Sequence, residues 1–222
     1  MTQLRLNLGR PVIYGREAFV QGPSNAHALE LVDAWPAWPG GALALVGPEA
    51  VGKTHVARAW VERAGAVVLD RDAPDIAAAA GRPVLVEDID RGIADEALFH
   101  LINMAGREGG GLLLTARAAP AAWACALPDL RSRLNALMVA EIDPPDDAVL
   151  EGVLRKFFRE RSIRPTRDVF PYLMRRIERS IPQALEVVRR LDDAADAAQR
   201  PISRALARQV LEDDSENLDL FE

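Results

Sequence analysis

The stretch that decides the fold is ALALVGPEAVGKTHVARAWVERAG, residues 42–65. Residues 42–46 form a short apolar run, which is typical of a strand buried on both faces of a parallel sheet. Residues 47–54, GPEAVGKT, fit the pattern G-x-x-x-x-G-K-[ST], and a helical pattern follows as far as Gly65. A strand, a glycine-rich loop and a helix in this order predict a phosphate-binding loop.

Each type of residue in this loop has a physical task. Gly47 and Gly52 allow a tight turn whose N–H groups point inward at phosphate oxygens. The helix that follows directs its positive N-terminal end at the same anion. Lys53 reaches the β- and γ-phosphates, and Thr54 offers its hydroxyl to Mg²⁺. We therefore expect ADP or ATP, with magnesium, as the ligand.

Further apolar runs alternate with helical patterns on either side of this loop. The additional strands are predicted at residues 66–70, 82–90, 111–117 and 135–142, and the helical segments at 24–35 and 94–109. In the first of these helical segments Ser24 is the expected N-cap. Strands that alternate with helices predict an α/β fold with a parallel five-stranded sheet.

The pattern changes at DPPDD, residues 143–147, after which only helical segments follow. They cover residues 146–161, 166–180, 181–198 and 202–213. We expect a core at 18–145, a small all-helical lid at 146–212, an N-terminal arm at 1–17 and a flexible acidic tail at 213–222.

Several polar residues follow the predicted strands and are candidates for the site. Glu87 and Asp88, in VLVEDID, can hold Mg²⁺ and orient water. Thr115 ends the fourth strand, where it can contact the γ-phosphate or the attacking water. Arg131 and Arg133, in LPDLRSRL, can project into the nucleotide of a neighbouring subunit, or they can be ordinary surface arginines.

Composition restricts the class of protein. There are 27 basic and 33 acidic residues, which argues against a general coat for nucleic acids. The single cysteine, Cys125, excludes an internal disulfide and is interpreted as a packing residue. The three histidines are scattered and predict no metal cluster. No signal peptide and no membrane-spanning run is recognised, so we expect a cytoplasmic protein without a membrane partner.

With these residues in place, the chain resembles the AAA+ ATPases of the DnaA initiator type, and among them the Hda-type regulatory proteins. The resemblance rests on AFVQGPSN at 18–25, GKTH at 52–55 and PDLRSRL at 128–134, in that order and spacing. By this match Arg133 is the arginine finger of the family. The resemblance implies an AAA+ core, a helical lid and a DnaA-type initiator as the partner.

The chain also departs from that family. Glu87 stands where the family more often has aspartate. In ERSIPQALE, Gln183 occupies the position of the second sensor arginine, and Arg179 lies one turn away. We expect no helix-turn-helix domain after the lid and no large N-terminal domain. These departures predict weak ATP hydrolysis by the chain itself.

Two terminal strips resemble the short motif with which Hda-type proteins dock on the replicative sliding clamp. The first is QLRLNL, with Gln3, Leu4, Leu6 and Leu8. Its alternation fits either an extended peptide in a partner's groove or a strand on the chain's own body. The second is NLDLF at 217–221, which offers Leu218, Leu220 and Phe221 and can instead fold back on the lid.

Three functions remain open on the sequence. The leading one is a negative regulator of replication initiation that docks on the clamp and promotes hydrolysis of initiator-bound ATP. The second is a free-standing AAA+ ATPase that acts as a loader or remodeller. The third is a DNA-binding module that uses arginines between Arg155 and Arg190. Most of these arginines lie on the helix faces opposite the apolar stripes, where solvated charge is expected, and no aromatic residues are interleaved for base stacking. No specific DNA binding is therefore expected. Association into a homo-oligomer is compatible with each.

Overall fold

The computed structural model describes residues 14–218, with side chains as far as Glu212. Five strands form one sheet in the order β2-β3-β4-β1-β5, and every neighbouring pair is parallel. Their bounds are Ala42–Val46 (β1), Val67–Leu69 (β2), Val84–Val86 (β3), Leu112–Ala116 (β4) and Met138–Glu141 (β5). The predicted α/β fold with a parallel five-stranded sheet is confirmed.

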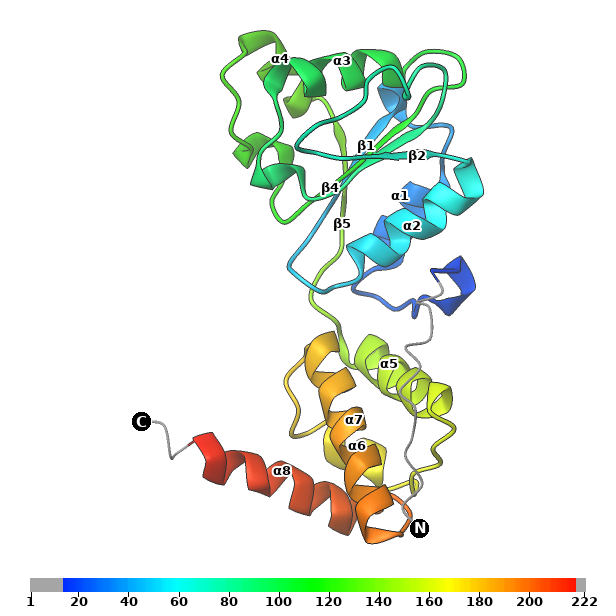
Figure 1. The fold of residues 1–222 in the computed structure, drawn as a ribbon, viewed down its shortest axis with the longest axis vertical. Helices are drawn as coiled ribbons and strands as arrows, with labels where there is room; N and C mark the ends of the chain where they lie inside the picture. The colour runs from blue at the N-terminus through cyan, green and yellow to red at the C-terminus, as the bar shows by residue number, and fades with distance from the viewer. Residues whose placement is uncertain (1–13, 219–222) are drawn as a thin grey trace.

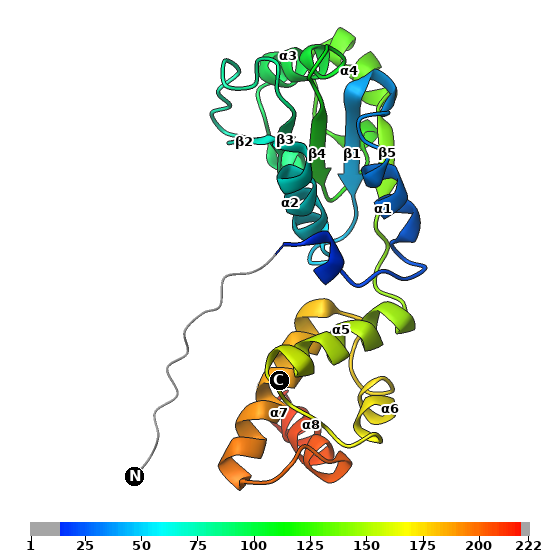
Figure 2. The same cartoon turned by 90° about the vertical axis from the view of Figure 1, so that its right-hand side faces the viewer.

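Helices cover both faces of this sheet (Figure 2). They are Ala26–Asp33 (α1), Lys53–Ala64 (α2), Asp95–Ala105 (α3) and Pro128–Asn135 (α4). Because side chains alternate along a strand, Leu43 and Leu45 pack toward α1 and α2, while Ala44 and Val46 pack toward α3 and α4. This double burial explains why the strand is apolar at every position.

Residues 147–218 form a separate helical domain, the lid, with its own core. Its helices are Asp147–Glu160 (α5), Val169–Leu173 (α6), Ile181–Ala198 (α7) and Arg204–Leu218 (α8). Leu150, Leu154, Val187 and Leu191 are fully buried between them. The lid lies beyond the carboxyl ends of the strands, whereas α3 and α4 pack on their face of the sheet toward its opposite end (Figure 1).

Local structure differs from the expectation in four places. The third strand ends at Val86, because Asp88 adopts a left-handed conformation with φ 55° and a 3-10 turn follows. The helix expected over 166–180 is limited to Val169–Leu173, and Ser180 caps the next helix instead. Helix α4 was not predicted from the sequence. Helix α8 continues to Leu218, so residues 213–218 have a helical backbone.

Residues 18–25, here called the entry segment, join the core to the lid. Ser24 does not cap α1, whose N-cap is Asn25. Instead, the Ser24 N–H donates to Asp146 Oδ2 at 2.7 Å, and Asp146 also caps α5 through Val149 N–H. Burial raises the pKa of Asp146, but these hydrogen bonds outweigh it and hold the pKa below its usual value. Asp146 is therefore ionised at neutral pH and ties the two domains together.

No helix among residues 14–218 is both long enough and apolar enough to cross a bilayer.

Candidate phosphate-binding site

The loop between β1 and α2 has the backbone that a phosphate-binding loop requires. Gly47 has φ 147°, and a Cβ atom there would lie 2.3 Å from the Ile142 carbonyl oxygen. Gly52 has φ 104° and forms the N-cap of α2, which begins at Lys53. Only glycine fits both positions without strain. The N–H groups of the first turn of α2 are left for an anion.

Lys53 is the central cation of this loop. It is only 8% exposed, and its Nζ donates to the carbonyl oxygens of Gly47 and Pro48 at 2.7 Å each. Burial lowers the pKa of Lys53, while the nearby carboxylates of Asp88 and Asp90 act in the opposite direction. When a phosphate is bound, the Lys53 ammonium group can replace these carbonyl contacts with a charge-assisted hydrogen bond to a phosphate oxygen.

The loop borders a cavity of about 330 Å³ at the carboxyl ends of the strands. Its walls are formed by the loop and by the segments that follow β3 and β4. The lining residues are Glu49, Ala50, Gly52, Lys53, Thr54, Asp88, Arg91 and Arg117. The structure thus brings Lys53, Thr54 and Asp88 together, as we expected from their positions at the ends of adjacent elements.

Two other predicted site residues, the magnesium candidate Glu87 and the catalytic candidate Thr115, lie outside this lining. The Glu87 carboxylate forms an ion pair with Arg58 of α2. Thr115 is 1% exposed, and its Oγ accepts the Asp88 N–H at 3.0 Å. Thr115 therefore fixes the backbone that carries Asp88, and Asp88 is the carboxylate of the pair that faces the cavity.

A magnesium ion fits the groups that the cavity presents. A magnesium ion at such a loop keeps several waters and takes one or two protein oxygens besides phosphate oxygens. Thr54 offers a hydroxyl and Asp88 a carboxylate that is 42% exposed. Asp90 Oδ1, which no hydrogen bond satisfies, is a further buried acceptor nearby in the sequence. In the described part of the chain no cluster of three or more His, Cys, Asp or Glu residues forms a metal site without phosphate.

Arg117, which follows β4 and lines the cavity, was not predicted from the sequence. Its guanidinium lies 2.9 Å from the Glu49 carboxylate of the loop, and its backbone N–H donates to Asp90 Oδ2. It is partly exposed and can turn from Glu49 to a phosphate. The signal was present in the sequence, because ligands of parallel sheets bind beyond the carboxyl ends of the strands.

Replacing Arg117 with alanine is expected to weaken binding of ADP and ATP about tenfold, since a hydrogen bond to a charged group contributes about 1.5–3 kcal/mol. Titration with a fluorescent nucleotide analogue measures this. Arg107→Ala is the matched control, because Arg107 is exposed and lies outside the cavity. Equal losses in the two variants would contradict a role for Arg117 in the cavity.

The entry segment passes directly beside the loop. The Phe19 ring is so close to Gly52 that a Cβ atom there would lie 2.7 Å from a ring carbon. His55, in the first turn of α2, contacts Phe19 edge-on and hydrogen-bonds to the Gly15 carbonyl oxygen. Burial lowers the pKa of His55, so the imidazole is neutral at pH 7. From the lid, Lys156 Nζ donates to the Ala18 carbonyl oxygen at 2.7 Å.

The two candidate sensor residues of the lid do not line the cavity. Arg179 is exposed and forms an ion pair with Asp147 at 3.0 Å. Gln183 lies in the first turn of α7, where its N–H faces Ser180 Oγ. The structure therefore places neither residue against the phosphate-binding loop.

Arg131 and Arg133 have different environments although both lie on α4. Arg131 donates to the carbonyl oxygens of Pro120, Ala121 and Trp123, so it stabilises the segment before the helix. Arg133 is exposed, and its guanidinium lies over the Phe99 ring at 5.0 Å from the centroid. Of the two, only Arg133 is free to reach another molecule.

The two terminal strips fall largely outside the described residues. Gln3, Leu4, Leu6 and Leu8 all precede Tyr14, where the described chain begins. Of the second strip, Leu218 ends α8, while Leu220 and Phe221 lie outside the described residues.

Comparison with known proteins gives sequence relatives for about half of the chain. No family model matches it. The chain is 28% identical over 116 residues to the chromosomal replication initiator protein DnaA of Thermomicrobium roseum. This match covers 52% of this chain and 25% of that protein. It is 27% identical over 118 residues to DnaA of Cutibacterium acnes, covering 53% and 24%. The matches thus span about a quarter of the length of these relatives.

Solved structures show the same fold over most of the chain. Domain III of Thermotoga maritima DnaA has a TM-score of 0.72 at 18% identity, covering 90% of this chain and 96% of that one. AMPPCP-bound DnaA from Aquifex aeolicus has a TM-score of 0.66 at 17% identity, covering 81% and 65%. The Holliday junction branch migration motor RuvB of Thermotoga maritima reaches 0.62 at 17% identity, covering 78% and 61%. The predicted resemblance to DnaA-type AAA+ proteins is confirmed in sequence and in fold.

Proposed function

We propose that this chain, which has the fold of DnaA domain III, is a negative regulator of replication initiation. It binds ADP or ATP with magnesium, docks on the DNA sliding clamp and presents Arg133 to ATP held by a DnaA-type initiator. The observation that carries the proposal is the position of Arg133, exposed on α4 at the end of the core away from its own loop.

The position of Arg133 fits action on a second molecule. The phosphate-binding loop lies at the carboxyl ends of the strands, on the lid side, whereas α4 packs on one face of the sheet toward its opposite end (Figure 1). The helix that carries Arg133 is therefore remote from the nucleotide site of its own chain. An arginine finger supplied from outside stabilises the charge on the transferring phosphoryl group.

The carboxylates support a regulator more than a self-sufficient enzyme. Glu87, the first acid of the pair, is engaged by Arg58, so within the pair only Asp88 faces the cavity. Arg179 pairs with Asp147 and does not line the cavity. Gln183, which also lies outside the lining, is an uncharged amide, so neither residue brings a positive charge to the cavity. Slow hydrolysis by the chain itself follows from this arrangement, while nucleotide binding is retained.

Clamp docking is assigned to the N-terminal strip. In an extended peptide, Leu4, Leu6 and Leu8 point to one side and can enter an apolar groove, while Gln3 supplies a polar contact at its end. The strip NLDLF offers a second peptide of similar chemistry. Two such strips on one chain would engage two subunits of a ring-shaped clamp and gain avidity.

Simultaneous replacement of Gln3, Leu4 and Leu6 with alanine is expected to weaken clamp binding about 100-fold, because each buried leucine contributes about 1.5–3 kcal/mol. Surface plasmon resonance on immobilised clamp measures this. The matched control replaces Arg5 and Asn7, which point to the other side of the same extended strip. The triple replacement is repeated with Leu218, Leu220 and Phe221 also changed to alanine. Unaltered affinity in the combined variant would contradict clamp docking through either strip.

The whole proposal is tested by single-turnover hydrolysis of ATP prebound to a DnaA-type initiator. Stimulation is expected only when both this protein and a clamp loaded on DNA are present. Stimulated hydrolysis in the absence of the clamp would contradict the clamp-docking part of the proposal. If hydrolysis is stimulated under no condition, the regulatory function is wrong.

A further inference from the structure

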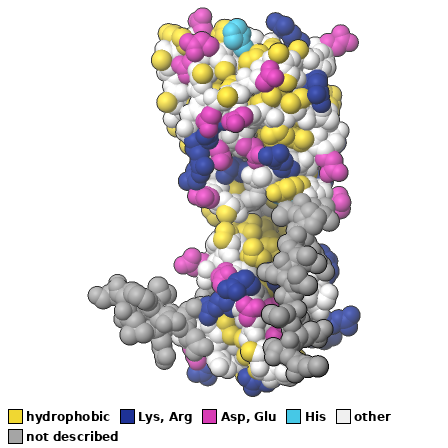
Figure 3. Space-filling view, viewed as in Figure 1, with side chains coloured by type: hydrophobic (Ala, Val, Ile, Leu, Met, Phe, Trp, Pro, Cys, Tyr) yellow, Lys and Arg dark blue, Asp and Glu magenta, His cyan; other side chains and the backbone are white. Residues whose placement is uncertain are grey.

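Basic and acidic residues are separated between the two domains. The core, residues 18–145, contains 10 basic and 16 acidic residues, whereas the lid, residues 146–212, contains 14 basic and 11 acidic ones. The excess is concentrated at residues 155–176, with eight basic residues against Glu160 and Asp168. On the face of the lid seen in Figure 3, dark blue side chains occur at several separate places.

Five exposed arginines line cavities beside the short helix α6 and lack a carboxylate partner among the residues whose side chains are described. They are Arg159, Arg164, Arg175, Arg176 and Arg204, here called the arginine face. Several other lid arginines form ion pairs; Arg189, for example, pairs with both Glu186 and Asp193. Guanidinium groups left without carboxylates are available to an external anion.

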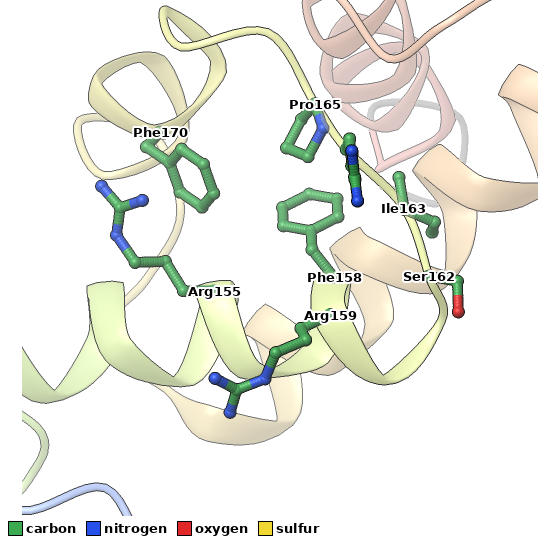
Figure 4. Close-up of a pocket in the computed structure, with 8 residues that line it drawn as sticks. Arg155, Phe158, Arg159, Ser162, Ile163, Pro165 and Phe170 are labelled. Atoms are coloured by element: carbon green, nitrogen blue, oxygen red, sulfur yellow. The ribbon is translucent and has the colours of Figure 1, made fainter.

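The two larger of these cavities lie one on each side of α6. The first, of about 590 Å³, is lined by Arg159 and Arg164 together with Phe170 (Figure 4). The second, also of about 590 Å³, is lined by Arg176 and Arg204 beside Tyr172. The arginine face therefore continues from one side of α6 to the other.

Aromatic rings are interleaved with these arginines, contrary to the expectation from the sequence. Arg176 lies 4.1 Å from the centroid of the Tyr172 ring, and Arg204 lies 5.6 Å from it. Arg155 lies over Phe170 at 4.2 Å. The rings hold the guanidinium groups at fixed places but are themselves covered, so they are not platforms for bases. The face thus offers oriented charge without an exposed stacking surface.

We infer that the arginine face binds the phosphate backbone of duplex DNA, without reading its sequence. The face presents guanidinium groups that can bind phosphate oxygens. It has no exposed ring on which an unpaired base could stack, which favours a duplex over a single strand. This inference is independent of the clamp and of Arg133, and it adds a contact that the proposed regulatory function does not require.

An acidic protein is a poorer match for this face. The centre of a protein interface is apolar and depleted in charge. Among the described residues, the large exposed apolar side chains are Val68, Val139 and Leu185, and none belongs to the arginine face. Interfaces with DNA are more polar and more positively charged.

The test is binding of the full-length protein to a labelled duplex of about 20 base pairs, followed by fluorescence anisotropy between about 50 and 200 mM salt. Each phosphate contact adds about 0.9 to the slope of log K against log salt. In the variant with Arg159 and Arg164 both changed to alanine, the magnitude of this slope is expected to decrease by about 1 to 2. The affinity at the lowest salt should fall at least about tenfold. Arg189→Ala is the matched control, because its charge is already paired, and it should retain both.

A second variant, with Arg176 and Arg204 changed to alanine, should behave like the first, and Arg176→Lys should keep the slope because the charge remains. Thermal unfolding of each variant verifies that the lid is folded. Three results would overturn the inference: no duplex binding at the lowest salt, an equal loss in Arg189→Ala, or binding to single-stranded DNA or polyglutamate as tight as to the duplex.

Discussion

Changing Arg133 to alanine should reduce the stimulated hydrolysis of initiator-bound ATP about 10³-fold, because an arginine finger supplied in trans contributes about 10³–10⁵ to kcat. Nucleotide binding by the protein itself should be unchanged, since α4 is remote from its own phosphate-binding loop. Clamp binding should also be unchanged. The readout is the single-turnover rate for radiolabelled ATP on the initiator, in the presence of a DNA-loaded clamp.

Two further variants determine whether the loss belongs to the guanidinium. Arg133→Lys keeps the charge but not the planar fork and should recover only a small part of the rate. Arg107→Ala removes another exposed arginine and should retain full stimulation. Arg131→Ala is unsuitable as a control, because Arg131 binds three carbonyl oxygens and its loss disturbs the segment before α4. Full stimulation by Arg133→Ala would refute the finger.

The second large effect is expected at Lys53. Its replacement by methionine keeps most of the buried stem but removes the ammonium group, and affinity for ADP and ATP should fall by at least about 100-fold, because the charge-assisted hydrogen bond and the charge attraction are both lost. Isothermal titration calorimetry measures the change. The variant should also lose the thermal stabilisation that nucleotide gives to the unchanged protein.

The same variant separates the regulator from the main alternative. A free-standing AAA+ ATPase that acts as a loader or remodeller would show steady turnover alone, and this would be abolished by Lys53→Met and by Asp88→Asn. A regulator shows little turnover of its own, with nucleotide still bound. Turnover by the protein alone at a rate near that of the stimulated initiator would favour the alternative. Nucleotide binding that survives Lys53→Met would contradict the assignment of the loop.

The sheet and the loop were predictable because their signals are local. A buried strand, a glycine-rich turn and a helix follow one another without interruption in residues 42–65, and each later strand is a separate apolar run. Helix α4 was missed because its apolar residues, Leu130 and Leu134, are few and its remaining positions are polar. The third strand was predicted too long, since apolar character alone does not reveal that Asp88 turns into a left-handed conformation.

The site was predictable only in part. Lys53, Thr54 and Asp88 meet because the carboxyl ends of parallel strands share one edge of the sheet. The ion pair between Glu87 and Arg58 joins residues that are 29 positions apart, because Arg58 belongs to α2. No local sequence pattern indicates this ion pair. The difference between Arg131 and Arg133 likewise depends on the path of residues 120–123. Such long-range pairings require the folded chain.

The entry segment has a practical consequence for dividing this protein into parts. Phe19 packs with the core while Val20, the next residue, packs with the lid, and Ser24 and Asp146 bond each other across the boundary. A fragment that ends at residue 145 would keep the whole sheet and yet leave Val20 in water and the Ser24 N–H without its carboxylate. The chain therefore changes domain near residue 146, but truncation there would not give two complete domains. Each half expressed alone would expose groups that are buried or hydrogen-bonded in the whole protein.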